Sequence, residues 1–499
     1  MTVTIDDRRS VNVDALRRVA FEGAGVALSE SAKTRIAAAH EALKRYVERH
    51  HDSFIYGVTS GWGPEAHRRS TLEQARARSA RGNPFGTLSF GGEPLPESLS
   101  RACVLADFAM IVDGNTGMHV GQAEAIGALL EQPLPQFPSR GITAAGEILP
   151  RMILFERLPA RAEWGLSVGS GNGAAVAAAM AGFAAVLGAR RLSLAERVLA
   201  LSTEAFNAPL EAYDLALAPL WGDPHETRAL EVLNGLLSGG TPRAGRRPYQ
   251  APVSYRILPR VLGAAGRSVA RLREVADGAL ATAVANPTFL PPSERYPDGR
   301  VLSTGGFHAG TTAPALDAVA AAWTDLAGLA HRHAIKLHKG EVSLLPDRLW
   351  DPDAVEGQRY STTYLEYVAN DFHEEMRRLA APTLLSGGEV AASGQDDIAA
   401  PTPLAFTTER RIAELLDGVL AILAVVASQA LFVTRRPAPP ALEPLLEFVR
   451  DRCPPVQSKR RLGDDTGLVA TGFSEAVADG AIWLTQEPWV SGPTPARTA

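Results

Sequence analysis

The chain has 499 residues, roughly three times a typical domain, so it can bury one or two large hydrophobic cores. Its 50 Lys and Arg residues and 55 Asp and Glu residues give a formal charge of −5, which excludes a basic surface for nucleic acid or anionic lipid. Two cysteines cannot build a disulfide framework, and charges in the first ten residues leave no apolar run for a signal peptide. We therefore expect a cytoplasmic protein that binds neither nucleic acid nor membrane.

Most of the chain has the apolar spacing of α-helices, and alternating strand patterns are nearly absent. The helical pattern is clearest at residues 189–206, 265–284 and 407–433. The uncharged stretches 164–189 and 418–434 are interpreted as buried core helices rather than membrane spans. The sequence therefore predicts a mainly α fold with a large helical core, completed by further copies of the chain.

A weak change of composition near residue 190 is the best candidate for a domain boundary. We expect a loop-rich helical domain over residues 1–190, and a central helical bundle with the C-terminal helices over residues 191–499.

Glycine-rich segments interrupt the helical pattern at residues 55–63, 113–117, 137–150, 165–173 and 301–310. Glycine allows the backbone to approach a ligand or another backbone segment closely. Because binding residues concentrate in loops that rigid elements hold, the functional interpretation is that these segments converge on one pocket. The alternative is that each is an ordinary helix connection.

Taken in order, these segments resemble motifs of the histidine, phenylalanine and tyrosine ammonia-lyase family, over about residues 10 to 435. Residues 56–63 resemble Tyr-Gly-x-x-Thr-Gly-Phe-Gly, and residues 250–259 resemble Gln-Asp-x-Tyr-Ser-x-Arg-x-x-Pro. Residues 305–309 resemble Gly-Gly-Asn-Phe-His, and residues 395–397 resemble part of Asn-Gln-Glu-Asp. The resemblance implies an ammonia-lyase-like (fumarase/aspartase-like) helical bundle, assembled as an elongated homotetramer whose sites draw loops from several subunits.

The resemblance also implies roles for individual residues. Tyr56 would exchange a proton with the β-carbon of a small-molecule substrate, Arg256 would bind the substrate's carboxylate, and Asp396 would be a second acid or base. The other residues of the substrate site would be Gln250, Phe307, Ser170, Gly63 and Ala145. A tyrosine has an ordinary pKa of about 10, so at neutral pH it acts as an acid or needs a lowered pKa.

Each of these residues also has a purely structural interpretation. Tyr56 would be a core tyrosine with a satisfied hydroxyl group, and Arg256 would form a structural ion pair. Phe307 would simply pack, and Asp396 would be a solvated loop carboxylate.

The chain departs from the family at the loop that makes the family's cofactor. The family cyclises Ala-Ser-Gly and expels the serine hydroxyl as water, which leaves an electrophilic methylidene-imidazolone. Here the corresponding tripeptide is Ala144-Ala145-Gly146, followed by Glu147 and Pro150. Alanine has no β-oxygen to expel, so we expect this electrophile to be absent, and we expect no other cofactor.

Other family positions differ as well. Ser170 and Gly306 each stand where the family has an asparagine. Val253 stands where it has a tyrosine, and Asp113 where it has an arginine. Tyr255 is a candidate to substitute for the tyrosine missing at position 253, and Asp113 would pair with Arg256 if the two lie close together. A literal Ala392-Ser393-Gly394 occurs beside the 395–397 motif and is interpreted as a chance match.

Two further patterns have simple structural interpretations. His331, His333 and His338 fall on one predicted helix but on different faces, so they predict no shared metal site. The basic run of residues 243–247 (RAGRR) is interpreted as a solvated loop that covers the pocket.

Three functions remain open. The first is an enzyme that uses Tyr56 for elimination, Michael-type addition or cyclisation on an activated, carboxylate-bearing substrate of specialised metabolism, without the electrophile. The second is a catalytically inactive homologue that binds a small acid or a partner protein. The third is an orthodox ammonia lyase or aminomutase whose electrophile forms at Ser393 or Ser170.

Overall fold

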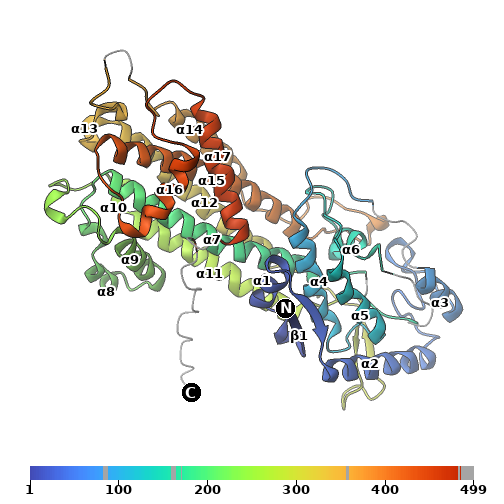
Figure 1. Cartoon of the computed structure of the whole chain (residues 1–499). Helices are drawn as coiled ribbons and strands as arrows, with labels where there is room; N and C mark the ends of the chain where they lie inside the picture. The colour runs from blue at the N-terminus through green and yellow to red at the C-terminus, as the bar shows by residue number, and fades with distance from the viewer. Residues whose placement is uncertain (82–87, 159–164, 170, 356–358, 482–483, 485–499) are drawn as a thin grey trace. The chain divides into compact units, whose positions relative to one another are not determined.

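The structure is a computed structural model that describes residues 1–81, 88–158, 165–169, 171–355, 359–481 and 484. The chain is mainly α-helical, and the strands in its described part are short (Figure 1). The predicted fold class is therefore confirmed.

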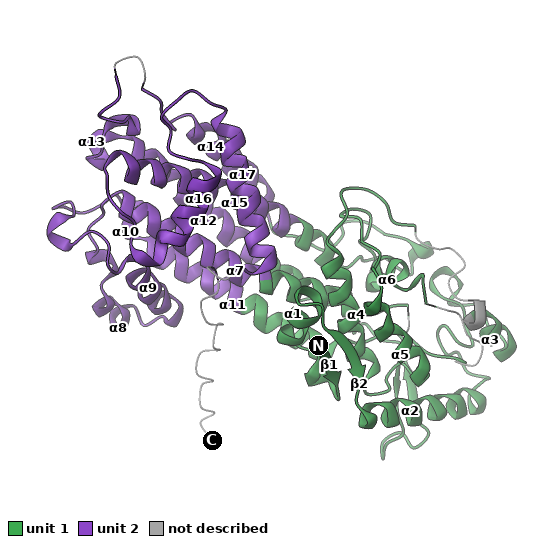
Figure 2. Cartoon of the chain, in the orientation of Figure 1, with its two compact units in different colours: residues 1–186, 271–316, 382–407 green, residues 187–270, 317–381, 408–499 purple. Residues whose placement is uncertain are grey.

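The chain forms two compact units, coloured separately in Figure 2. Unit 1 comprises residues 1–186, 271–316 and 382–407, and unit 2 comprises residues 187–270, 317–381 and 408–499. This division differs from the predicted one at residue 190, because two later segments belong to unit 1. The physical reason is that four long helices run from one unit into the other: α7 (Ala175–Ala205), α11 (Leu258–Thr282), α12 (Thr312–His338) and α15 (Thr402–Val433).

Unit 1 combines short helices with two small sheets. Its helices are α1 (Val13–Phe21), α2 (Glu30–Arg49), α3 (Leu72–Arg81), α4 (Glu97–Ile111), α5 (Val120–Ala128) and α6 (Ile148–Phe155). Strands β1 (Thr2–Ile5) and β2 (Gly25–Leu28) pair in parallel, and β3 (Thr288–Leu290) and β4 (Arg300–Leu302) pair antiparallel. Helix α2 begins after Ser29, whose hydroxyl accepts a hydrogen bond from the Ala32 amide at 3.1 Å.

Unit 2 consists of helices and connecting loops, with no strand in its described part. Its shorter helices are α8 (Ala218–Trp221), α9 (Pro224–Leu237), α10 (Val253–Arg256), α13 (Gly340–Ser343), α14 (Leu365–Leu379), α16 (Glu443–Arg452) and α17 (Leu462–Asp479). Helix α9 begins after Asp223, whose carboxylate accepts hydrogen bonds from the His225 and Glu226 amides. Helix α17 ends at Gly480, which adopts the left-handed conformation that suits glycine.

Helices α7 and α15 are long and apolar enough to cross a membrane by length and composition alone. The protein itself buries 83% of the most apolar window of α7 and 94% of that of α15. This burial is that of core helices, as the sequence predicted.

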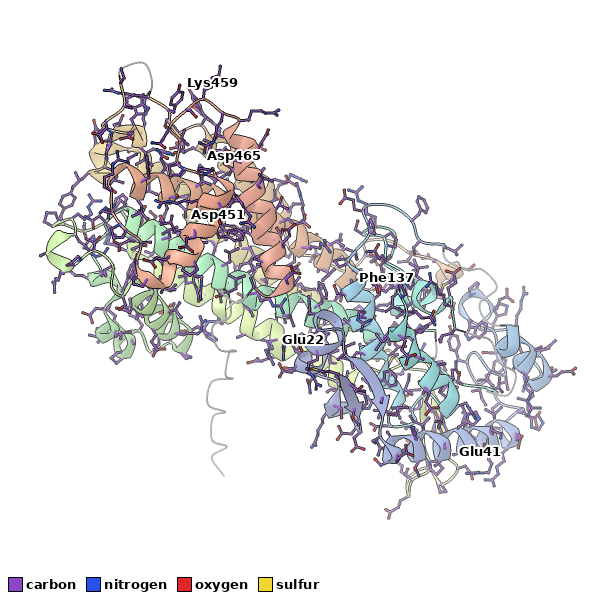
Figure 3. All side chains as sticks on the ribbon, in the orientation of Figure 1. Glu22, Glu41, Phe137, Asp451, Lys459 and Asp465 are labelled. Carbon is purple, nitrogen blue, oxygen red and sulfur yellow. The ribbon has the colours of Figure 1, made fainter. Side chains whose placement is uncertain are left out.

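Buried charges in unit 2 are generally paired. Arg191 on α7 donates two hydrogen bonds of 2.9 Å to the carboxylate of Asp417 on α15, and Ser474 donates a third. By contrast, charged side chains such as Glu41, Asp451 and Lys459 are exposed (Figure 3). The core therefore admits charges where a partner satisfies them.

Candidate functional site

Glycine-rich segments that are far apart in the sequence meet within unit 1, and backbone hydrogen bonds join them. In each bond a backbone amide donates to a backbone carbonyl oxygen, and the distances are from N to O. The donor and acceptor residues are Val168 and Thr116 (2.8 Å), Phe289 and Asn115 (2.7 Å), Gly173 and Gly146 (3.1 Å), Asn286 and Asn172 (3.3 Å), and Ala400 and Ala144 (3.1 Å). The Asn286 side chain also accepts a hydrogen bond from the amide of Thr304. These segments, called the loop cluster below, are residues 113–117, 144–147, 165–169, 171–174, 284–289, 301–307 and 391–400.

Tyr56 lies in a tight turn whose geometry the neighbouring residues fix. Its hydroxyl oxygen accepts a hydrogen bond of 3.1 Å from the amide of Gly63, so its own proton remains available to donate. Gly57 has a φ of +74°, and a Cβ at this position would collide with the indole ring of Trp62. The Arg78 guanidinium lies 5.4 Å from the centre of that ring.

Residues 391–400 connect the Tyr56 turn with the Ala144 loop. A Cβ placed on Gly63 would lie 3.3 Å from the Cβ of Ala392, so the two turns are in contact. At the other end of this segment, Ala400 donates to the Ala144 carbonyl group. Asp396 lies between these two contacts, and burial, with a contribution from Asp397, raises the pKa of its carboxyl group. A raised pKa favours the protonated form of this carboxyl group, which is the form that can donate a proton.

The Ala144-Ala145-Gly146 loop has an unusual backbone and offers no hydroxyl group. Gly146 and Glu147 adopt consecutive left-handed conformations, with φ values of 59° and 55°. A Cβ on Gly146 would collide with the side chain of Asn172, so glycine is required there. Ala145 itself is 8% exposed, and its side chain carries no heteroatom.

Glu147 is fully buried and anchors this loop to α7. Its Oε2 accepts a hydrogen bond of 2.8 Å from the Ala177 amide in the first turn of that helix. Burial raises the pKa of Glu147 to about 8, against the opposing effects of backbone hydrogen bonds and of Arg151. Arg151 in turn forms a buried ion pair with Asp107 on α4. Glu147 is thus largely protonated at neutral pH, and its carboxyl group holds the loop in place.

The structure distributes the predicted site residues over both units. Gly63, Ala145, Phe307 and Asp396 belong to unit 1 together with Tyr56, and Phe307 is partly exposed in its loop. Gln250 and Arg256 belong to unit 2, where both are exposed, and Arg256 Nε donates to the carbonyl oxygen of Ala251 at 3.0 Å. Ser170 lies outside the described residues.

The structure corrects two expectations about pairing and replacement. Asp113 forms its ion pair with Arg8, at 2.7 Å, rather than with Arg256. Tyr255 is buried, with its ring stacked on His333 at 3.7 Å, so it does not stand in for the missing tyrosine at the exposed position 253.

The basic run of residues 243–247 is not a solvated loop, because Arg246 and Arg247 are each 7% exposed. Arg243, by contrast, is exposed, as the sequence suggested. A charge run in a short loop gives no sign of burial, because residues distant in the sequence supply the cover. In the described part of the chain, no group of His, Cys, Asp and Glu residues has the geometry of a metal site.

Comparison with known proteins identifies the family. Residues 11–158 and 165–451 match the aromatic amino acid lyase family. The chain belongs to this family. It is 28% identical to the histidine ammonia-lyase of Symbiobacterium thermophilum, over 95% of this chain and 96% of that protein. It is 26% identical to the histidine ammonia-lyase of Bacillus subtilis, over 86% of this chain and 87% of that protein.

Solved structures show the same fold at lower identity. Ergothionase, an ergothioneine-degrading enzyme from Treponema denticola, superposes with a TM-score of 0.80 at 16% identity, over 96% of this chain and 99% of that one. Tyrosine aminomutase from Streptomyces globisporus gives a TM-score of 0.81 at 21% identity, over 96% of this chain and 97% of that one. Two solved enzymes with different names thus share the fold found here.

The substitution Gly57→Ala tests the geometry of the Tyr56 turn. It is expected to lower the free energy of unfolding by about 3 kcal/mol, since it adds a collision with Trp62 to the cost of a left-handed alanine. Gly23→Ala is the matched control, because Gly23 has a φ of +70° and open space around it, and about 1 kcal/mol is expected. Equal losses in urea denaturation would contradict the close packing against Trp62.

The substitution Glu147→Gln tests whether Glu147 carries a proton. Because its folded pKa of about 8 exceeds the model value of 4.5, the native state holds this proton more tightly than the unfolded state. This contribution to stability is complete below about pH 4.5 and declines as the pH rises to about 8. At pH 8.5 the variant should be more stable than the wild type by roughly 2 kcal/mol.

The measurement for Glu147 is urea denaturation at several values between pH 5 and pH 8.5, with the exposed Glu41→Gln as the charge-matched control. The decline should persist in Glu41→Gln and become shallower in Glu147→Gln. An unchanged decline in Glu147→Gln would show that another group causes it.

Proposed function

We propose that this member of the aromatic amino acid lyase family catalyses elimination, Michael-type addition or cyclisation without a methylidene-imidazolone. The observation that carries the proposal is Ala145, which lies in the loop joined through residues 391–400 to the Tyr56 turn. Residues 144–146 do not fit that cofactor, because forming its exocyclic methylene requires a β-oxygen. Without the electrophile a poor leaving group such as ammonium is not activated, so the substrate itself must be activated.

Tyr56 is the proposed proton-transfer group. Removal of a β-proton by the phenolate form gives the neutral phenol, and the electron pair left on the substrate forms the double bond as the leaving group departs with its own electron pair. A hydroxyl group departs as water when it takes a proton from the carboxyl group of Asp396, the proposed second acid, whose pKa burial raises. In the reverse sense, the phenol donates its proton to a substrate that has accepted a nucleophile. The hydrogen bond from the Gly63 amide stabilises the phenolate in both directions, because an N–H donor interacts more strongly with a charged oxygen.

Arg256 is the proposed anchor for a substrate carboxylate, which places the substrate among small carboxylic acids. Its guanidinium can form two parallel hydrogen bonds with such a group. Arg256 and Tyr56 belong to different units of the chain. In line with the family resemblance, we propose a homotetramer in which loops of several copies build each site.

Two alternatives have observations in their favour. An inactive binding protein is favoured by Ala145, which cannot form the electrophile. It is also favoured by the hydrogen bond from Arg256 Nε to the Ala251 carbonyl oxygen, which takes up one donor of that guanidinium. An orthodox ammonia lyase is favoured by the likeness to histidine ammonia-lyases and by Ser393, which lies in a left-handed turn whose residue Ala392 contacts the Tyr56 turn.

The test compares two substrate panels with the purified full-length protein. The first contains L-histidine, L-phenylalanine and L-tyrosine, and ammonia release is measured. The second contains 3-aryl-2-hydroxypropanoates, in which removal of a β-proton and loss of the 2-hydroxyl group as water give strongly absorbing unsaturated acids. The wild type should turn over members of the second panel only, and Tyr56→Phe should lower kcat by about 100-fold or more. Tyr46→Phe is the matched control, because Tyr46 is a partly exposed tyrosine in the same unit.

Each other result has a defined meaning. Full activity in Tyr56→Phe with an intact fold would overturn the role of Tyr56. Ammonia release from the first panel would establish the orthodox reaction instead. No turnover of either panel, together with saturable binding of the acids, would favour the inactive binding protein.

A further inference from the structure

Arg247 is a buried cation whose guanidinium has no polar partner in the described part of the chain. Arg247 precedes α10 in the chain, and the residue is 7% exposed. The Nε and Nη1 atoms are buried and make no hydrogen bond with any described residue. The remaining nitrogen, Nη2, is not among these buried, unpaired atoms. An arginine keeps its charge at all accessible pH values, so this burial is unfavourable unless an anion compensates it.

The other buried arginines in the described part do not share this feature. Arg151 and Arg191 pair with buried aspartates, Arg197 donates to Ser193, and Arg246 pairs with Glu204 at 2.6 Å. Each therefore has a polar side chain as its partner. The isolation of Arg247 is thus not a general property of the core.

Aromatic rings hold the Arg247 guanidinium in a fixed position. Phe206 and Tyr249 each place a ring centre 4.6 Å from its Cζ atom. Phe206 stacks on Tyr255 with 4.2 Å between the ring centres, and Tyr255 stacks on His333 with 3.7 Å between the ring centres. Cation–π contacts offset part of the cost of burying the charge, but rings leave the N–H groups without acceptors. The rings therefore fix the orientation of the Arg247 guanidinium but accept no conventional hydrogen bond from its N–H groups.

The charge around Arg247 has a positive excess. Glu204, at the end of α7, uses Oε1 for Thr241 and Oε2 for Arg246. Arg436 donates to the carbonyl oxygens of Glu204 and Ala205. The guanidinium groups of Arg246, Arg247 and Arg436 therefore all lie against residues 204–206. The one carboxylate of this segment, that of Glu204, already accepts hydrogen bonds from Thr241 and Arg246. The local field favours a further anion.

We propose that Arg247 is the anchor of a carboxylate-binding site in unit 2, an anchor other than Arg256, and the proposal does not depend on the proposed reaction. One oxygen of a carboxylate can accept a hydrogen bond from Nη2, and the second oxygen reaches a neighbouring N–H group when the groups that bury it move aside. Tyr249 is 51% exposed and covers one side of Arg247, so its ring would pack against the organic part of the ligand. The ligand is a small molecule that carries a carboxylate; a side-chain carboxylate from a second copy of the chain is the other source of the same chemistry.

The experiment measures benzoate binding by isothermal titration calorimetry, and Tm with and without benzoate, in a chloride buffer near pH 7.5. Wild type should bind benzoate with a rise in Tm, and Arg247→Met should weaken binding by at least about tenfold. In benzoate-free buffer Arg247→Met should keep or raise Tm, because it removes an uncompensated buried charge. Arg243→Met is the control, since Arg243 is an exposed arginine of the same loop that pairs with Glu211, and it should bind like wild type.

A carboxylate from a second copy gives a different pattern that also supports the site. Benzoate then has no effect, and Arg247→Met, but not Arg243→Met, lowers the mass of the assembly in light scattering. The proposal is overturned if benzoate binds wild type and Arg247→Met equally, or if neither benzoate binding nor the assembly mass depends on Arg247. Should Arg247→Met fail to fold, Arg247→Lys keeps the charge without the paired donors; binding weakened by about tenfold supports the proposal, and unchanged binding overturns it.

Discussion

The hydrogen bond from the Ala177 amide to the buried carboxyl group of Glu147 is the contact on which the loop cluster depends. It attaches the loop of residues 144–147 to the first turn of α7, a helix whose apolar residues are packed in the core. The Gly146 and Ala144 carbonyl groups then accept hydrogen bonds from residues 173 and 400. A loop rich in left-handed residues is thereby held by a rigid helix.

The scaffold and the chemistry have separable requirements. The backbone hydrogen bonds around residues 144–147 need no side chain at position 145, so the loop keeps its supports although Ala145 cannot supply a β-oxygen. The Tyr56 turn is likewise fixed by Gly57, Gly63 and Trp62 rather than by the Ala144 loop itself. The proposed absence of the electrophile would therefore leave Tyr56, the proposed proton-transfer group, in an ordered setting, which is the basis of the proposed function.

Helical periodicity predicted the mainly α fold and the buried helices near residues 175–189 and 418–433, since a helix that is apolar on every side requires a core. The glycines of residues 55–63 likewise indicated a segment in which the backbone approaches another group closely, and the structure shows such an approach between Gly57 and Trp62. The sequence did not predict the burial of Arg246 and Arg247 or the pairing of Asp113 with Arg8, because these depend on residues that are distant in the chain. It also did not predict that residues 271–316 and 382–407 return to unit 1, which follows from long helices that cross between the units.

The central claim is that the chain works without the family's electrophile, and the intact mass of the purified, denatured protein tests it most directly. Cyclisation with loss of the serine hydroxyl removes two molecules of water from the chain. The account predicts a mass equal to that of the encoded sequence, with unmodified peptides covering residues 144–146 and 392–394. A mass lower by two waters, mapped to Ser393 or to any other serine, would contradict it and establish the orthodox chemistry.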